Sequence, residues 1–542
     1  MEFNQEEEVR VRKGLMGAVL IGVFFLSGAA FAWQGRMAGM GDPYGLVEDE
    51  SDFLINPAKI SDGQGVKYYG NYRFTYGDIS AWKWNGNSVN IAGIVDAQKS
   101  AGGTEYDHEA LVGAGFPLGL GRMGVFFNYS GKRSSFDGTT ATASDVIPNV
   151  NSVFDMKSDF DDLALRVIYG QPVGSWKLGG EVQVGYRREE NRFTNTMYAY
   201  GIPDPYSIET NGFGGDLLPF MLPFDAHYWE VIAKAGVEGN LGPVKTGLTI
   251  HGGSIFSGDN NWTGSQQIPF AFIPSTSFNS NGGVDGWKLG GDFQARYPYS
   301  ENLSLPFLVR VDYMEKSRDG MGTSGDFLVS FGNPPFFPIP AFPVVAGSNL
   351  NLNSGSKERL LQLEVGGGID WTVGKNTRIA SGLYYDYVRL KTDMHMTVFD
   401  PVFFESTFFD YGAVPNRTEH LARFKVSAES RVAPDWTVRG GLNVFGGTIQ
   451  EDFNSSFMWD VLPLATFTTS MDGTHWGIVG SIGATTKICG FTVEPFVQGG
   501  YEEISLSDGN ADSTVLGISG FGWNMDAERR QAIVGVGVSV TF

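Results

Sequence analysis

The chain has little of three things that most soluble proteins of its size contain. Its 542 residues include one cysteine, Cys489, which excludes an intramolecular disulfide, a cysteine zinc cluster and a paired haem attachment. Charged residues make up only 18%, below the roughly 25% of soluble domains. Long apolar runs are missing too, except for one at the N-terminus. The abundant residues are instead glycine (74) and the aromatics (14%), a mixture that favours many strands over a few hydrophobic helices.

The first 32 residues have the pattern of a secretory signal peptide. Arg10, Arg12 and Lys13 precede the apolar run GLMGAVLIGVFFLSGAA, and residues 30–32 (AFA) offer a cleavage site. We therefore predict that residues 1–32 are removed, and a retained membrane anchor is the alternative. The net charge of −21 argues against nucleic acid as a partner.

The rest of the chain repeatedly alternates apolar and polar residues with a period of two. In residues 533–542, IVGVGVSVTF, the valines alternate with glycine, serine and threonine. In residues 175–187, SWKLGGEVQVGYR, an apolar face runs from Trp176 to Tyr186, and charged residues fill the other face. Ten residues at about 3.3 Å each, tilted near 45°, cover roughly the 25 Å apolar band of an outer membrane. The same spacing of two aromatics recurs at 287–297 and 491–501.

Segmented by this rule, the chain contains sixteen strands joined alternately by short and long connections, as in outer-membrane barrels. We therefore predict an all-β fold: a transmembrane antiparallel β-barrel of about 16 strands (range 14–18) over residues 66–542. Its last strand should pair with its first, and both termini should lie in the periplasm of a Gram-negative cell. A soluble all-β repeat protein is the alternative. The predicted strands begin near Val66, Asp107, Gly121, Asp162, Ser175, His227, Pro243, Gly286, Leu303, Glu358, Asn376, Thr418, Asp435, Thr474, Gly490 and Gln531. The predicted long connections are 77–106, 131–161, 191–226, 254–285, 317–357, 393–417, 450–473 and 506–530.

The predicted inner face carries many full charges. A packed soluble core would need a partner for each of them, whereas a water-filled lumen tolerates them. Rings of charge can select which solutes pass, or they can pair across strands and stiffen the wall, and both interpretations remain open. The predicted lumen-lining residues are Arg73, Arg122, Arg166, Lys177, Glu181, Arg187, Lys288, Asp292, Arg296, Arg310, Asp312, Arg423 and Arg439.

Residues 33–65, WQGRMAGMGDPYGLVEDESDFLINPAKISDGQG, precede the first predicted strand. Their R-x-x-G-M-G pattern, acidic stretch and N-P-A motif, together with the aromatic C-terminal strand, resemble the long-chain fatty-acid transporter family of the outer membrane and related porin-like barrels. The resemblance implies that this segment is a plug, or hatch, inside the barrel; a short tether at the barrel mouth is the alternative. The chain departs from that family in its strand number, since fourteen are expected there. The residues matched to the plug are Arg36, Gly39, Met40, Gly41, Asn56 and Pro57.

Several predicted long connections are rich in Pro, Phe and Leu, for example NPPFFPIPAFPVVAG at 333–347. Apolar loops of this size need something to cover them. They can form a capture site and lid for an apolar ligand, constrict the lumen, or dock a partner protein. The predicted capture residues are Phe336, Phe337, Phe342, Phe403, Phe404, Phe408 and Phe409.

Signals of enzyme chemistry are weak. The six histidines form no H-E-x-x-H pair, and neither G-x-S-x-G nor a phosphate-binding glycine loop is present. We therefore predict no catalytic site, metal or cofactor. The preferred function is an outer-membrane channel or transporter that takes up hydrophobic or amphipathic small molecules. The alternatives are a structural sheath or platform for a partner protein, such as an electron-conduit cytochrome or a secretion component, and a general diffusion porin. The expected partners are outer-membrane lipid, a small solute and a possible protein docked on the loops or in the lumen.

Overall fold

The computed structural model describes residues 34–41, 45–90, 93–144, 150–199, 206–208, 224–266, 276–325, 350–399, 407–459, 462–488, 491–515 and 518–541. The predicted signal peptide and five of the seven predicted capture residues lie outside these ranges. So does Cys489.

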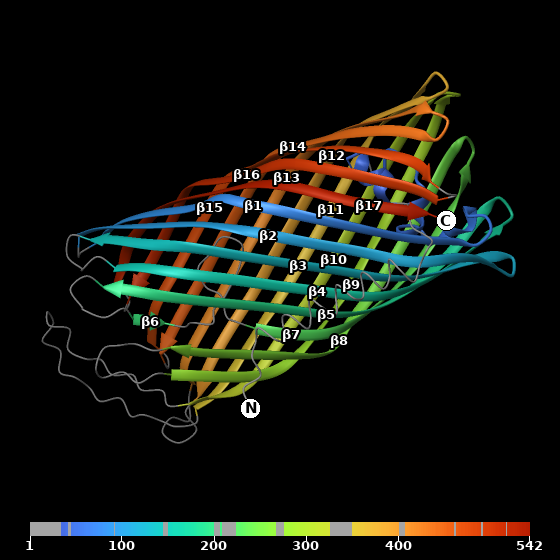
Figure 1. Cartoon of the computed structure of the whole chain (residues 1–542). Coiled ribbons are helices and arrows are strands. Elements are labelled where there is room, and N and C mark those ends of the chain that lie inside the picture. Colours follow the sequence, from blue (N-terminus) through green and yellow to red (C-terminus); the bar gives the residue numbers. More distant parts are fainter. Residues whose placement is uncertain are drawn as a thin grey trace, which may run out of the picture.

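Sixteen long antiparallel strands form one closed barrel, as predicted (Figure 1). Neighbours in the sequence are neighbours in the sheet, and β1 closes the barrel by pairing with β17 from Tyr69↔Thr541 to Val89↔Gly522. A seventeenth strand, the three-residue β6, pairs only with β5. Closure leaves no unpaired edge along the barrel wall. The long strands are β1 Lys67–Asn90, β2 Gly93–Leu118, β3 Gly121–Ser144, β4 Val150–Val173, β5 Trp176–Ala199, β7 Phe224–Leu241, β8 Val244–Gln266, β9 Thr276–Ser300, β10 Leu303–Gly325, β11 Leu350–Val373, β12 Thr377–Phe399, β13 Thr407–Ala433, β14 Trp436–Trp459, β15 Leu462–Ile488, β16 Phe491–Val515 and β17 Ile518–Thr541, and β6 spans Tyr206–Ile208.

The two faces of each strand differ as the alternation predicts. On β12, Leu383 is 66% exposed and Tyr385 is 43% exposed, while Tyr384 between them is only 3% exposed. Apolar side chains therefore form the outer surface of the middle of the barrel, and polar or closely packed ones face the interior. This arrangement suits a barrel whose outside meets lipid and whose inside holds water and polar groups.

The short turns lie where the sequence places them, at the end of the barrel that carries the C-terminus (Figure 1). Strands β3 and β10 begin at the predicted residues, Gly121 and Leu303. Four of these turns contain a glycine with φ between +60° and +66°, at Gly119, Gly174, Gly242 and Gly374. Only glycine adopts this left-handed conformation without strain, so these residues fix the tight reversals.

The predicted long connections are wrong in extent, because the strands run well into them. For example, β1 reaches Asn90 and β2 starts at Gly93, inside the predicted connection 77–106. The strands that run toward the short turns likewise begin 3 to 14 residues earlier than predicted. The reason is physical: beyond the membrane band a strand needs only backbone pairing, and its side chains no longer have to alternate between lipid and lumen. The segmentation relied on that alternation.

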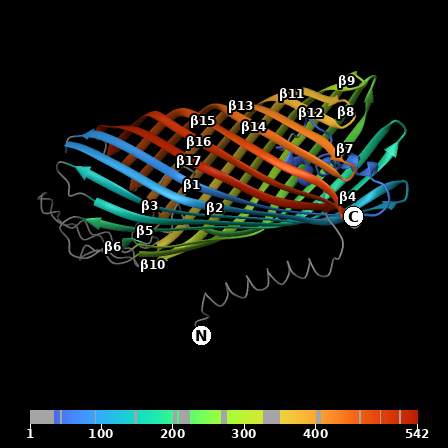
Figure 2. The same ribbon diagram turned by 45° about the horizontal axis from the view of Figure 1, so that its top comes forward.

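The N-terminal segment lies inside one end of the barrel. It contains α2 (Gln34–Gly39) and the short 3-10 helices η1 (Glu50–Leu54) and η2 (Pro57–Asp62). Figure 2 shows these elements, in blue, at the end where the C-terminus lies. Among the described residues, no helix is long and apolar enough to span a membrane.

Candidate functional site: the lumen and the N-terminal segment

The motifs of the N-terminal segment are local folding signals. Asn56 caps η2, because its side-chain Oδ1 accepts a hydrogen bond from the Ala58 N–H at 3.1 Å, and Pro57 occupies the first turn. The Asn56 side chain also donates to the carbonyl of Val237 on β7 at 3.1 Å. The N-P-A motif thus starts a helix and attaches it to the wall at the same time. Asp49 caps η1 in a similar way, by accepting from the Ser51 N–H.

Wall glycines allow the N-terminal segment to approach the barrel closely. A Cβ atom on Gly441 would collide with the backbone of Met40, and one on Gly179 would collide with the backbone of Pro57. Gly41 itself has φ of +77° and lies against the backbone of Gly441. These contacts leave no room for a side chain, so the glycines on both sides are needed for this packing.

Two apolar clusters join the segment to the wall. In the first, Met40, Leu46 and Val47 pack with Leu308 and two further wall residues, Ala380 and Tyr384. The second lies on the opposite part of the segment, and all of its side chains are almost completely buried. Its members are Phe53, Ile60, Tyr69, Leu111, Phe126 and Ile168.

Ion pairs fix the charged residues of the segment. Arg36 pairs with Asp49 at 2.9 Å and with Glu429 on β13 at 2.8 Å. Burial opposes the charge on Arg36, but the hydrogen bonds and negative charges of Glu429 and Asp49 outweigh it, so the pKa of the Arg36 guanidinium is raised. Arg36 therefore stays charged, and its removal would leave Glu429 without this partner.

A second ionic cluster surrounds Lys59. Its Nζ lies 2.8 Å from Asp52 and 3.7 Å from Glu238 on β7. Burial opposes the charge here as well, but the surrounding carboxylates raise the pKa of Lys59. On the other side of the cluster, Glu48 pairs with Lys245 on β8 at 2.7 Å.

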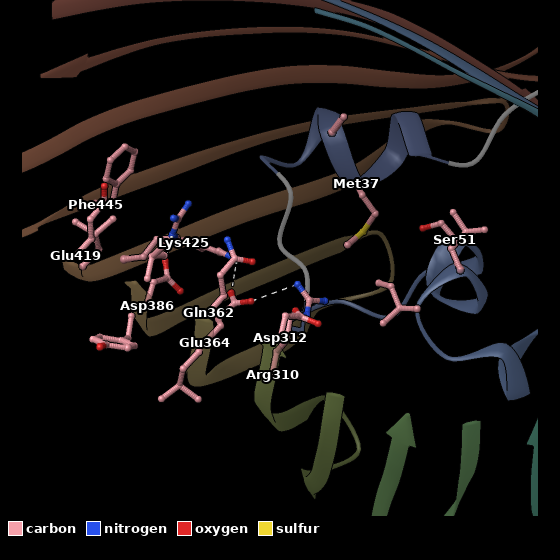
Figure 3. Close-up of a pocket in the computed structure, with 18 of the residues that line it drawn as sticks. Met37, Ser51, Arg310, Asp312, Gln362, Glu364, Asp386, Glu419, Lys425 and Phe445 are labelled. Atoms are coloured by element: carbon pink, nitrogen blue, oxygen red, sulfur yellow. Dashed lines mark hydrogen bonds and ion pairs between the residues drawn. The ribbon is translucent and has the colours of Figure 1, made fainter. Parts of the chain in front are cut away.

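A cavity of about 880 Å³ lies beside this segment, in the lumen. Figure 3 shows α2 with Met37 on one side and charged wall residues on the other. The apolar lining of the cavity comes from the segment (Met37, Leu54 and Ile55) and from wall residues that include Leu421 and Phe445. A molecule in this cavity would meet apolar and charged groups together, which suits an amphipathic ligand more than a simple ion.

The charged wall of the cavity is an ion-pair network. Arg310 lies 3.5 Å from Glu364, and Lys425 lies 3.5 Å from the same carboxylate. Arg423 pairs with Asp386 at 2.8 Å, and its guanidinium also lies over the Phe445 ring at 5.2 Å. The network holds these side chains in place along the wall of the cavity.

His475 extends this network at one edge of the cavity. Its Nδ1 lies 3.4 Å from Glu419 and its Nε2 lies 3.1 Å from Glu502. No sequence pattern indicates this contact, because the three residues belong to three different strands. Within the described residues, no cluster of three or more His, Cys, Asp or Glu side chains is arranged to hold a metal ion.

The predicted lumen residues divide into three groups. Arg122, Lys177 and Arg296 contact the N-terminal segment, at the carbonyl of Gly65, the carboxylate of Asp62 and the carbonyl of Leu46. Another group lines the cavity: Arg73, Arg310, Asp312 and Arg423. The remaining members pair within the wall: Arg166 with Glu181, Arg187 and Lys288 with Glu230, Asp292 with Arg310, and Arg439 with Glu494.

Most of the predicted capture residues lie outside the part of the chain that the structure describes. Phe336, Phe337, Phe342, Phe403 and Phe404 lie outside the described residues. Phe408 and Phe409 belong to β13, where Phe409 is opposite Val398 in the register. The last two are therefore in a strand, and not in the loop that the sequence predicted.

The closed wall, apolar exterior and charged interior define a transmembrane β-barrel of the outer-membrane class. Comparisons with known proteins add little beyond this. No family model matches the chain, and no curated protein matches its sequence. Among solved structures, the chain is similar to the TodX deltaS2S3 mutant monoaromatic hydrocarbon channel, with 10% identity, 94% of this chain and 98% of that chain covered, and a TM-score of 0.40. It is also similar to a Pseudomonas aeruginosa FadL homologue (12% identity, 95% and 99% covered, TM-score 0.38) and to the Pseudomonas putida toluene transporter TodX (11% identity, 93% and 96% covered, TM-score 0.36).

Proposed function

We propose that the chain is an outer-membrane channel that takes up hydrophobic or amphipathic small molecules, with its N-terminal segment as the plug. The observation that supports this most directly is the cavity of about 880 Å³ between that segment and the barrel wall. It is large enough for a small organic molecule. Its lining combines apolar side chains, such as Leu54 and Phe445, with charged ones.

The attachment of the segment favours a gated channel over a general diffusion porin. Two apolar clusters and the ion pairs of Arg36 and Lys59 hold the segment against the wall. A solute therefore has to pass a structured obstacle, and not an open pore. We further propose that this end of the barrel faces the periplasm, because short turns and both chain ends are typical of that side.

The proposed uptake is tested in cells whose outer membrane contains the full-length chain. The probe is the hydrophobic dye N-phenylnaphthylamine, whose fluorescence rises when it reaches an apolar environment inside the envelope. We expect faster dye uptake than in cells without the barrel, and no added permeability to sucrose in liposome swelling. Unchanged dye uptake would reject the channel for hydrophobic molecules, and rapid sucrose entry would favour a general porin.

The proposed plug is tested separately by deleting residues 33–60. The deletion should increase single-channel conductance in planar bilayers, because it removes the segment that fills this end of the lumen. Unchanged conductance in a correctly folded deletion variant would reject the plug and leave the barrel assignment intact.

A further inference from the structure

The outer surface of the barrel carries a compact basic patch on two neighbouring strands. Lys357 and Arg359 lie on β11, and Arg389 and Lys391 lie on β12. The unbroken register between the strands places Arg359 opposite Lys391 and Lys357 opposite Asp393. Because directly opposite residues share a face, all of these side chains lie on one side of the sheet.

That side is the outer one. On β12, exposed Leu383 and Tyr385 have the same parity as Arg389 and Lys391, and the register shows no shift between them. The basic patch is therefore on the outer face of the barrel, which contacts lipid nearer the short turns, and does not face the lumen.

The patch lies at one edge of the membrane band. Directly below it, toward the short turns, aromatic and imidazole side chains gather on the same face. Tyr385 forms a 2.6 Å hydrogen bond with His420, and the rings of Tyr313 and Trp287 lie 4.9 Å apart. Aromatic girdles of this kind mark the boundary between the apolar core of a membrane and its headgroups. The four basic residues thus begin where lipid headgroups begin.

The positive charges are only partly balanced. Glu315 lies 2.6 Å from Lys357 and 3.3 Å from Arg359, and Asp393 lies 2.8 Å from Arg359 and 3.1 Å from Lys391. Two carboxylates therefore contact three of the four cations. Arg389 is exposed and donates to the neutral side-chain oxygen of Asn416 at 3.4 Å.

Further carboxylates lie only at the margins of the patch. Asp285 is opposite Ser317 on β10, which is itself opposite Lys357. Asp452 is opposite Asn416, which is opposite Lys391. Each is thus two strands away from the nearest cation, about 10 Å, a distance at which salt screens exposed charges strongly. Asp319 is exposed and lies on the neighbouring strand β10, diagonal to Lys357, because Ser317 is opposite Lys357 and Asp319 is opposite Gly355.

A like-charged pair directly opposite in a sheet is unfavourable, and Arg359 and Lys391 form such a pair. An anion with several oxygens would relieve this repulsion and occupy the donors that the two carboxylates leave free. Elsewhere on the same level of the outer surface, cations are matched by acids: Arg133 contacts Asp159 and Asp161, and Arg188 contacts Asp225 and Glu190. The patch on β11 and β12 differs because its four cations have only two carboxylates in ion-pair contact.

We propose that Lys357, Arg359, Arg389 and Lys391 bind the phosphate groups of lipopolysaccharide. The patch lies at the end of the membrane band remote from the short turns and the end of β17, and so in the outer leaflet if the short turns are periplasmic. In that leaflet the main phosphorylated lipid headgroup is lipid A. The proposal rests on the proposed orientation of the barrel, and it does not depend on which solute the lumen takes.

The test compares lipid binding by the folded full-length barrel and two charge variants in detergent, using native mass spectrometry. The first variant removes the patch (K357Q/R359Q/R389Q/K391Q). The control removes three cations of the acid-balanced region (R133Q/R188Q/R192Q), where Arg192 also pairs with Glu190. The probes are bisphosphorylated lipid A, dephosphorylated lipid A, phosphatidylglycerol and inorganic phosphate. Slower migration after boiling than before in SDS gels establishes that each variant is folded.

We expect the patch variant to bind bisphosphorylated lipid A at least about tenfold more weakly than the wild type, and the control variant to bind it as the wild type does. Dephosphorylated lipid A should bind the wild type weakly, and its affinity should be no weaker for the patch variant. A parallel loss of phosphatidylglycerol binding is compatible with the proposal, provided that lipid A binds more tightly. The proposal is overturned if lipid A binding is unchanged in the patch variant, if both variants lose it equally, or if the site prefers phosphatidylglycerol or inorganic phosphate.

Discussion

The guanidinium of Arg36 donates two hydrogen bonds to the carboxylate of Glu429, from Nε to Oε2 at 2.9 Å and from Nη2 to Oε1 at 2.8 Å. This two-point contact joins the start of the N-terminal segment to strand β13, nearly four hundred residues later. It is the ionic contact between segment and wall with the most restrictive geometry, because both groups are planar.

The first prediction concerns this contact. Arg36→Gln should raise single-channel conductance, because it removes charge-assisted hydrogen bonds worth about 1.5–3 kcal/mol and leaves Glu429 without its guanidinium partner. Arg431→Gln is the control, since Arg431 is exposed and donates only to carbonyls near its own turn. Equal conductance of the two variants would contradict a closing role for Arg36.

The second prediction concerns the close approach of Met40 to Gly441. Gly441→Val should displace the N-terminal segment, because a side chain there collides with the Met40 backbone. The measurement is the rate of trypsin cleavage at Arg36 and Lys59, which should rise severalfold. The control is Gly440→Val, whose side chain faces the other side of β14 and meets only Ser481 at van der Waals distance. If both variants stay as resistant as the wild type, the segment does not depend on this packing.

A third prediction concerns pH. Burial opposes the charge on Glu48, but Lys59 and Lys245 outweigh it and lower its pKa from the usual 4.5 to about 2. A carboxylate whose pKa is lowered in the folded state stabilises that state above its unfolded pKa, and this contribution is lost as the pH falls through the folded value. The attachment of the segment should therefore weaken as the pH falls from about 4.5 to about 2.

Conductance recorded between pH 7 and pH 2 checks this. The conductance of the wild type should rise at the acid end of this range. The conductance of Glu48→Gln should already be raised at pH 7 and should change less on acidification. Superimposable profiles would mean that Glu48 does not hold the segment in place.

The fourth prediction uses the lipid-facing surface. Leu383 is 66% exposed on the outer face of β12 and lies two residues inside the aromatic girdle of Tyr385, so Leu383→Arg should lower the free energy of unfolding by about 1–2 kcal/mol, between the interface and midplane costs. The control is Gln362→Arg, because Gln362 lines the lumen cavity, where a charge meets water and acidic neighbours. Urea unfolding in lipid vesicles measures both values. A similar loss in the two variants would contradict the assignment of outside and inside.

The sequence was sufficient to predict the barrel and the positions of its short turns. Alternation such as that of Trp176 to Tyr186 is imposed by lipid on one side and polar groups on the other, so it can be seen residue by residue. It failed for the outer part of the strands, where backbone pairing alone forms structure and residues such as Asn87 and Asp137 give no alternating signal. Contacts between strands that are not directly paired, such as that of His475 with Glu419, depend on the tertiary structure and cannot be seen in one sequence. The role of Asn56 as a helix cap could have been predicted, because Asn followed by Pro is a typical start of a helix.

The length of the strands has a consequence for where molecules enter. Strand β1 has 24 residues, and at about 3.3 Å each with a tilt near 45° it rises about 55 Å, twice the apolar thickness of the membrane. In the proposed orientation, the wall extends beyond the apolar band of the membrane on the outer side, into the layer of lipopolysaccharide sugars. If the chain is the proposed channel, a hydrophobic solute could then enter the lumen at the top of the wall without first crossing that layer.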